Sequence, residues 1–129
     1  MAGNPLSMLA GMTCLDQLRK PGLYERLEKH AQTLAAAARS ASETHGVPVH
    51  IGQFKGSLSI QFTDERVIDF DGCNRSSSKL FARFFQLMLE QGILIPPSKY
   101  EALFISAAHS ETDIAYTAEC FERAFAKMA

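Results

Sequence analysis

The spacing of apolar residues predicts four helices, over about residues 5–18, 23–45, 78–91 and 111–128. The first is apolar on more than one side, which is typical of a helix that packs against several partners. Gly46 and Gly92 are expected to end the second and third helices, because glycine easily adopts the left-handed conformation found at helix C termini. Ser110 and Asp113 resemble a capping box at the start of the last helix.

Alternation of apolar and polar residues predicts short strands, at 47–51, 58–62, 67–68, 93–95 and 103–106. Gly52 and Gly56 indicate a bend, or a hairpin with a β-bulge, between the first two strands. Phe54 is out of phase with Ile51, which supports an irregularity there. Residues 63–78 are polar and are expected to form a long loop around the short strand at 67–68.

This order of elements predicts an α+β fold of two layers. Adjacent strands with short connections favour a mostly antiparallel sheet of three or four strands, with the helices packed on one face. The first helix does not suit this arrangement, because it is apolar all round and is followed by the break at 20–22. We expect residues 1–19 to belong with a neighbouring domain and residues 20–129 to form the compact unit.

Composition indicates an ordinary soluble globular chain, with 47% apolar and 21% charged residues. Thirteen basic and fourteen acidic side chains give no overall attraction to nucleic acid or to an anionic membrane. No apolar run approaches the roughly 18 residues that span a bilayer. Three widely spaced cysteines argue against a disulfide framework or a zinc site, and together with the absence of a signal-peptide pattern they favour the cytoplasm.

Two groups of residues suggest chemistry but have simpler explanations. Ser106 and His109 could supply a nucleophile and a base, but no flanking glycines form a nucleophile elbow. The capping box at Ser110 explains the same spacing, so we favour it. The acidic residues between 64 and 71 lack EF-hand spacing, and the four histidines lack metal-ligand spacing. No metal site is expected, and His30, on the apolar stripe of its helix, is interpreted as a packed histidine.

Glu101 is the most informative carboxylate. It lies between Tyr100 and the apolar run 102–105, at the mouth of a predicted strand. A carboxylate in that place is either exposed at the end of the strand or held in a site, and the residue types alone favour exposure.

Three stretches together resemble one enzyme family over nearly the whole chain. They are GNPLSMLAG at 3–11, the segment 18–49 with its Pro-Gly-Leu-Tyr start, and SKLFARFFQLMLEQGILIPPSKYEALFISAAHSETDI at 78–114. These are similar to the C-terminal part of glutamate-1-semialdehyde 2,1-aminomutases, which belong to the class III aminotransferase group of pyridoxal-phosphate enzymes. The resemblance implies a fold-type I enzyme, in which residues 1–19 form a linker helix from a large cofactor domain and 20–129 form the C-terminal small domain. It also implies a homodimer.

The resemblance implies that the catalytic apparatus lies upstream of Gly3 in the family. There a lysine forms the Schiff base with pyridoxal phosphate. The lysines of this chain are Lys20, Lys29, Lys55, Lys79, Lys99 and Lys127, and none lies in the family's lysine motif. We therefore expect no catalytic or cofactor-binding residue here, no bound pyridoxal phosphate, and no activity of the chain alone. The resemblance implies that Glu101 faces the substrate side of the site.

Three functions stay open at this stage. The first is a domain of an aminomutase that converts glutamate-1-semialdehyde to 5-aminolevulinate for tetrapyrrole (porphyrin) synthesis. The second is a domain of another class III aminotransferase, because Leu103 stands where many family members have glycine and residues 63–77 do not match the family's usual loop. The third is a free-standing, non-catalytic docking or dimerisation domain, which the apolar first helix would suit.

Overall fold

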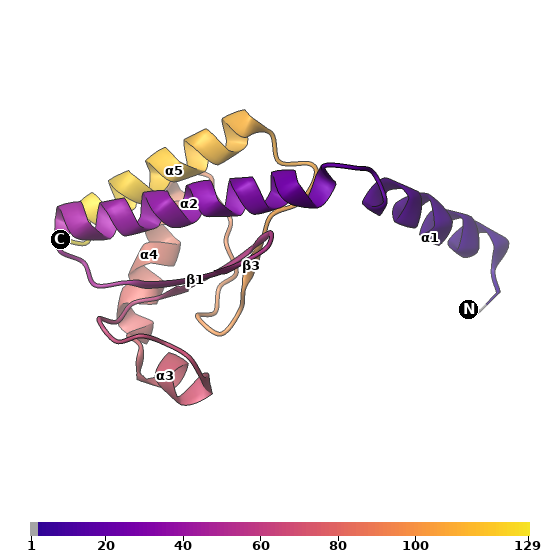
Figure 1. The fold of residues 1–129 in the computed structure, drawn as a ribbon. Helices are drawn as coiled ribbons and strands as arrows, with labels where there is room; N and C mark the ends of the chain where they lie inside the picture. The colour runs from indigo at the N-terminus through magenta and orange to yellow at the C-terminus, as the bar shows by residue number, and fades with distance from the viewer. Residues whose placement is uncertain (1–2) are drawn as a thin grey trace.

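The computed structural model describes residues 3–129. It contains α1 (Pro5–Leu18), α2 (Leu23–His45), β1 (His50–Phe54), β2 (Ser57–Gln61), α3 (Phe70–Arg75), α4 (Ser78–Glu90), β3 (Leu103–Phe104) and α5 (Glu111–Ala126). The α2 and α5 helices pack against each other along one side of a small sheet, and α1 extends away from this body (Figure 1). The predicted α+β class is confirmed.

The sheet has three antiparallel strands in the order β1-β2-β3. The β1-β2 register runs without interruption from His50 opposite Gln61 to Phe54 opposite Ser57, so the predicted β-bulge is wrong. Phe54 is out of phase with Ile51 simply because successive side chains point to opposite faces of a strand. Ile51 is buried in the core, whereas Phe54 is 75% exposed on the other face.

Other predicted strands are absent or shorter. Residues 67–68 form no strand, and Ile68 is exposed, so it lacks the half-buried sheet surface that favours β-branched residues. Asp69 instead starts α3, because its carboxylate accepts a hydrogen bond from the Gly72 amide at 2.7 Å. Residues 93–95 are irregular and lead into two prolines, which have no N–H to donate to a neighbouring strand. The strand predicted at 103–106 is shortened to β3.

The core lies between the sheet and the helices, and aromatic rings dominate it. Phe84, Phe121 and Phe125 are fully buried, and the rings of Phe62, Phe84 and Phe125 lie 5.4–5.8 Å apart between centroids. The buried face of α2 is mostly alanine, at 31, 35, 38 and 41. Such small side chains allow the α5 backbone to approach closely, which explains why α2 and α5 make the most extensive contact in the fold.

The first helix forms as predicted but buries nothing. The Asn4 side chain accepts hydrogen bonds from the amides of Leu6 and Ser7, and Pro5 occupies the first helical position. None of its residues is buried. Its large exposed apolar side chains are Leu6, Met8, Leu9, Met12, Leu15 and Leu18. Within residues 3–129 no helix combines the length and apolarity needed to cross a bilayer.

Candidate functional site

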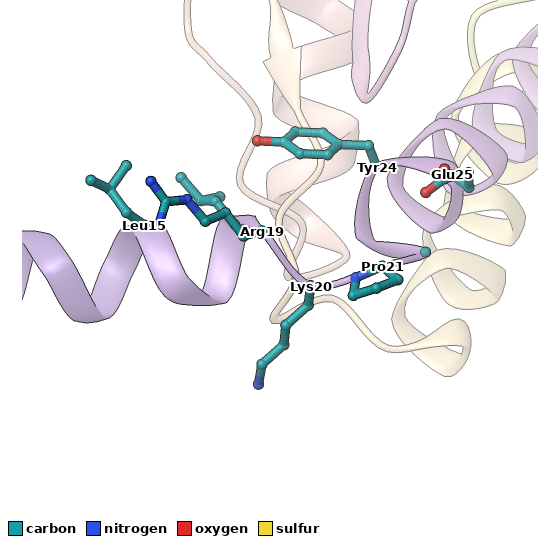
Figure 2. Close-up of a pocket in the computed structure, with 8 residues that line it drawn as sticks. Leu15, Arg19, Lys20, Pro21, Tyr24 and Glu25 are labelled. Carbon is teal, nitrogen blue, oxygen red and sulfur yellow. The ribbon is translucent and has the colours of Figure 1, made fainter.

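A surface trough of about 510 Å³ lies where α1 meets α2 (Figure 2). Leu15, Arg19 and Tyr24 are among the residues that border it. Tyr24 extends toward Arg19 across the gap, while the Lys20 side chain points away. Every lining residue is exposed, so the trough holds no desolvated polar group that could do chemistry.

A second cavity, of about 410 Å³, lies on the sheet face turned away from the core; we call it the sheet-face cavity. Its floor comes from the two long strands and its wall from the loop before α3. The lining residues are His50, Gly52, Ser59, Gln61, Val67, Ile68, Asp69, Phe70, Cys73 and Tyr100. Strand alternation creates this floor, since the apolar residues of β1 and β2 face the core and small or polar residues face outward.

The floor of the cavity depends on a glycine. Gly52 pairs with Ser59 across the β1-β2 ladder. A Cβ atom at position 52 would lie 2.5 Å from Ser59 Oγ, which is too close unless the serine side chain moves. A larger residue at position 52 would therefore fill part of the cavity.

A buried polar network holds the wall of the cavity to the sheet. The side-chain amide of Gln61 donates to the Lys99 carbonyl oxygen at 2.6 Å. Gln61 Oε1 accepts from the Ser76 hydroxyl at 2.8 Å and from the Cys73 thiol at 3.3 Å. Every polar atom of this side-chain amide thus has a partner inside the protein, as a buried amide requires.

Lys99 is 5% exposed, although lysine is rarely buried. Its Nζ donates to the carbonyl oxygens of Cys73 at 2.9 Å, Asn74 at 3.0 Å and Ser76 at 2.7 Å. These carbonyls lie at the C-terminal end of α3, where backbone acceptors lack helical partners and a positive charge is favourable. Lys99 therefore closes the end of α3. Nothing in the local sequence distinguishes Lys99 or Gln61 from a solvated side chain, so neither role could be predicted.

The contacts between the end of α3 and residues 99–100 also fix the turn that carries Glu101. The Tyr100 hydroxyl donates to Asn74 Oδ1 at 2.8 Å, and the Tyr100 ring packs on Phe70 with centroids 5.7 Å apart. The Glu101 amide donates to the Ser98 carbonyl at 3.1 Å. Its side chain is exposed, as the residue types favoured. The backbone at Glu101 is thus well anchored while its carboxylate is free to meet a ligand or another domain.

His50 lies half-buried at the rim of the sheet-face cavity. Partial burial, and then the positive charges of Arg66 and Arg39, hold the pKa of its imidazole below the usual 6.5. We expect an NMR titration of the imidazole to show a midpoint below 6.5. Between the two pKa values the unfolded chain binds more protons than the folded chain, so this group should lower stability as the pH falls below about 6.5.

Arg66→Gln provides the control for this titration, because it removes a positive charge without touching the imidazole's burial. The His50 midpoint should then move upward toward 6.5. A wild-type midpoint above 6.5, or no upward movement in the variant, would contradict the electrostatic explanation.

Ser106, His109 and Ser110 lie together in the exposed turn before α5. His109 Nδ1 accepts a hydrogen bond from the Ser106 amide at 3.0 Å and lies 3.3 Å from the Ser106 hydroxyl oxygen, so the amide and the hydroxyl share one ring nitrogen. Ser110 and Asp113 form the predicted capping box of α5, with hydrogen bonds of 3.2 Å and 2.8 Å. Hydrogen bonds from the Ser110 backbone N–H and hydroxyl lower the pKa of the Asp113 carboxyl. The cap interpretation is confirmed.

The remaining candidate groups are also accounted for by structure. Glu65 pairs with Arg75 at 3.2 Å, and residues 3–129 contain no group of three or more histidine, cysteine or acidic side chains arranged to hold a metal ion. His30 is packed as predicted, at 4% exposure, and neither ring nitrogen has a hydrogen-bond partner among the described residues. All three cysteines are free thiols.

The placement of the lysines bears on the expectation that this chain holds no pyridoxal phosphate. Schiff-base formation needs a lysine amine facing a cavity. No lysine lines the sheet-face cavity, and the nearby Lys99 amine is fully engaged with three carbonyl oxygens. Lys20 borders the trough but points away from it, and Lys55 pairs with Glu28 at 3.4 Å. No catalytic step is therefore assigned to this chain's own lysines.

No protein-family model matches the chain, but solved structures share its fold. An omega-transaminase from Sphaerobacter thermophilus matches 95% of this chain with a TM-score of 0.78 and 22% identity. A glutamate-1-semialdehyde aminomutase from Pseudomonas aeruginosa PAO1 matches 85% with a TM-score of 0.75 and 15% identity. The FumI protein of Sphingopyxis sp. MTA144, solved in its pyridoxal-phosphate internal aldimine form, matches 94% with a TM-score of 0.73 and 24% identity.

In each of these comparisons the match covers only part of the solved chain. It spans 28% of the omega-transaminase, 24% of the aminomutase and 26% of FumI. The chain therefore has the fold of one portion, about a quarter in length, of aminotransferase-type polypeptides.

Proposed function

We propose that the chain is the C-terminal small domain of a pyridoxal-phosphate enzyme of the class III aminotransferase group. The observation that carries this proposal is the extent of the structural likeness, because the match to the omega-transaminase covers 95% of the present chain. The family motifs at 3–11 and 78–114 support the same origin. In this proposal residues 1–19 are the linker helix from the large cofactor domain, and the exposed apolar side chains of α1 pack on that domain.

The proposal covers first the class of reaction and then the specific substrate. The whole enzyme moves an amino group, and pyridoxal phosphate, held by the large domain, supplies the electron sink for that chemistry. The motif resemblance favours glutamate-1-semialdehyde as substrate and 5-aminolevulinate as product, in a cytoplasmic homodimer serving tetrapyrrole synthesis. The omega-transaminase and FumI, at 22% and 24% identity against 15% for the aminomutase, support another aminotransferase as the second candidate.

This chain would contribute the edge of the substrate site. The turn carrying Glu101 is held by Lys99 and Tyr100, which fixes the position of its backbone. An exposed carboxylate there would attract the amino group of a substrate, or a lysine of the large domain. Glu101 is thus the proposed substrate-side residue, and the chemistry itself belongs to the other domain.

Spectroscopy of the purified chain tests the first part of the proposal. Added pyridoxal phosphate should give no stable aldimine absorbance, because in this proposal the Schiff-base lysine belongs to the large domain and the buried Lys99 amine is engaged with three carbonyl oxygens. The FumI protein of Sphingopyxis sp. MTA144, which has been solved in its internal aldimine form, is the positive control. A stable aldimine on this chain, removed by changing one of its lysines, would contradict the proposal.

An antibody raised to this domain tests the second part. We expect the native polypeptide in the source cells to be much larger than 14.2 kDa, or to purify with a separate cofactor-carrying polypeptide. A band of about that mass with no such companion would favour the free-standing docking domain. The exposed apolar α1 supports that alternative, which predicts self-association and binding of a hydrophobic dye.

A further inference from the structure

The first strand of the sheet has an open edge. The strand order is β1-β2-β3, so among the described residues no strand lies beside β1 on the side away from β2. An open edge presents unpaired backbone N–H and C=O groups, with which a strand of another molecule can pair. The other outer strand, β3, has only two residues and offers little for pairing, whereas β1 has five. The edge of β1 is therefore the one that needs protection.

The strand itself carries none of the usual protective features of an edge strand. Its sequence is HIGQF, which contains no proline and no lysine, arginine or acidic side chain. Its register with β2 is continuous, so no β-bulge turns it away from a partner. Protection of this edge must therefore come from another element.

A side chain of α2 reaches this edge. Arg39 Nη2 donates a hydrogen bond to the Ile51 carbonyl oxygen at 3.0 Å. In an antiparallel pair, alternate residues turn their backbone N–H and C=O groups away from the neighbouring strand, and Ile51, whose carbonyl accepts from α2, is one of these. Hydrogen bonds from a charged donor are stronger than neutral ones. The guanidinium thus occupies an acceptor that an added strand would need.

The space beside the strand is large enough for another chain once the arginine is removed. Arg39 and Ile51 border a hollow of about 430 Å³, together with Glu43 and His50. A strand added to β1 would lie about 4.8 Å from it, on the side from which the guanidinium now approaches. Arg39 forms no ion pair among residues 3–129, so its contact with the strand does not compete with a salt bridge.

We propose that Arg39 blocks the pairing of β1 with β1 of a second copy of this chain. A second copy is the partner to expect, because two identical strands can pair antiparallel about a two-fold axis and offer each other the same donors and acceptors. Such pairing would also bring two Arg39 side chains to one junction, where like charges repel. The role concerns association and not the reaction, so it does not depend on the proposed function.

Arg39→Ala tests the proposal, because it removes both the hydrogen bond and the charge. Sedimentation velocity should show self-association about tenfold or more stronger than that of the wild-type chain, since no charged donor competes for the carbonyl. Amide hydrogen exchange followed by NMR locates the contact: exchange of the Ile51 amide should slow as the concentration of the variant rises, but not in the wild type. Association through the exposed apolar side chains of α1 is common to both proteins and cancels in this comparison.

Two further variants serve as controls. Arg83→Ala removes an exposed arginine of α4 that forms no ion pair among the described residues, and it should behave like the wild type. Arg39→Lys keeps a positive charge and a donor at position 39, and it should restore most of the block.

Several outcomes would overturn the proposal. One is that Arg39→Ala associates no more strongly than the wild type or than Arg83→Ala. Another is stronger association that leaves exchange of the Ile51 amide unchanged, because the contact would then lie elsewhere. Arg39 is exposed, so circular dichroism should show that Arg39→Ala folds normally. An unfolded variant would contradict the proposal as well, because Arg39 would then be needed for folding itself.

Discussion

Replacing Phe84 with alanine is expected to lower the free energy of unfolding by about 3–5 kcal/mol. The ring is fully buried and lies 5.4 Å from Phe62, 5.5 Å from Phe121 and 5.8 Å from Phe125 between centroids. It therefore joins the sheet, α4 and α5 in one cluster, and its loss would leave a cavity that rigid neighbours cannot close. Domains of this size have about 5–15 kcal/mol of stability in total, so the variant should be close to unfolding. Urea denaturation followed by circular dichroism measures the change.

The matched control is Phe104→Ala, which makes the same chemical change at a ring that is 76% exposed. In the isolated chain it should alter the free energy of unfolding by no more than about 0.5 kcal/mol, because folding removes little of the Phe104 ring from water. A similar loss in both variants would mean that the core is not organised around Phe84.

Four of the five helices among the described residues could be predicted from sequence because the signals for them are local, whereas α3 lies in a segment predicted to be a loop. Asn4 and Pro5 start α1, Ser110 and Asp113 start α5, and Gly46 and Gly92 adopt left-handed conformations at φ 66° and 80°. Each of these signals acts within one helical turn. Apolar residues at steps of three and four then identify the buried face, and tertiary contacts are not needed to see it.

The strands were harder to predict because a strand depends on a partner distant in sequence. Val67 and Ile68 have strong β-propensity, but no strand lies beside them to pair with. Ile95 is buried in the core but is not part of a strand. Its apolar character therefore indicated that it is buried, and it did not indicate a strand. The β-propensity of a residue depends on the neighbouring strands and side chains against which it packs. Those neighbours cannot be identified from the local sequence.

The candidate site was predictable only in part for the same reason. Glu101 stood out because it lies at the mouth of a predicted strand and because the family resemblance implies a substrate-side position for it. The groups that hold its turn, Gln61 and the carbonyls of residues 73–76, come from distant parts of the chain. Lys99 therefore looks like an ordinary surface lysine until the fold brings three acceptors to its amine.

Lys99→Met should lower the free energy of unfolding by about 2–3 kcal/mol, because it removes the amine donor of the Asn74 and Ser76 carbonyl oxygens while keeping most of the side-chain volume. The amine now donates to the carbonyl oxygens of Cys73, Asn74 and Ser76 at 2.7–3.0 Å. We also expect faster amide hydrogen exchange in α3 and in the turn at Tyr100, since the hydrogen bonds of the Lys99 amine connect these two segments. Exchange measured by NMR reports this local change, and urea denaturation reports the global one.

Lys79→Met is the matched control, because Lys79 is exposed on α4 and makes no ion pair among the described residues. It should change stability by less than about 0.5 kcal/mol. If Lys99→Met proved equally neutral and left α3 exchange unaltered, Lys99 would have no anchoring role. If instead it loosened α3 and the turn without unfolding the core, the lysine would be a positioning residue that acts on Glu101 through the backbone it holds. A buried methionine could fill that space but could not bind α3 to the turn.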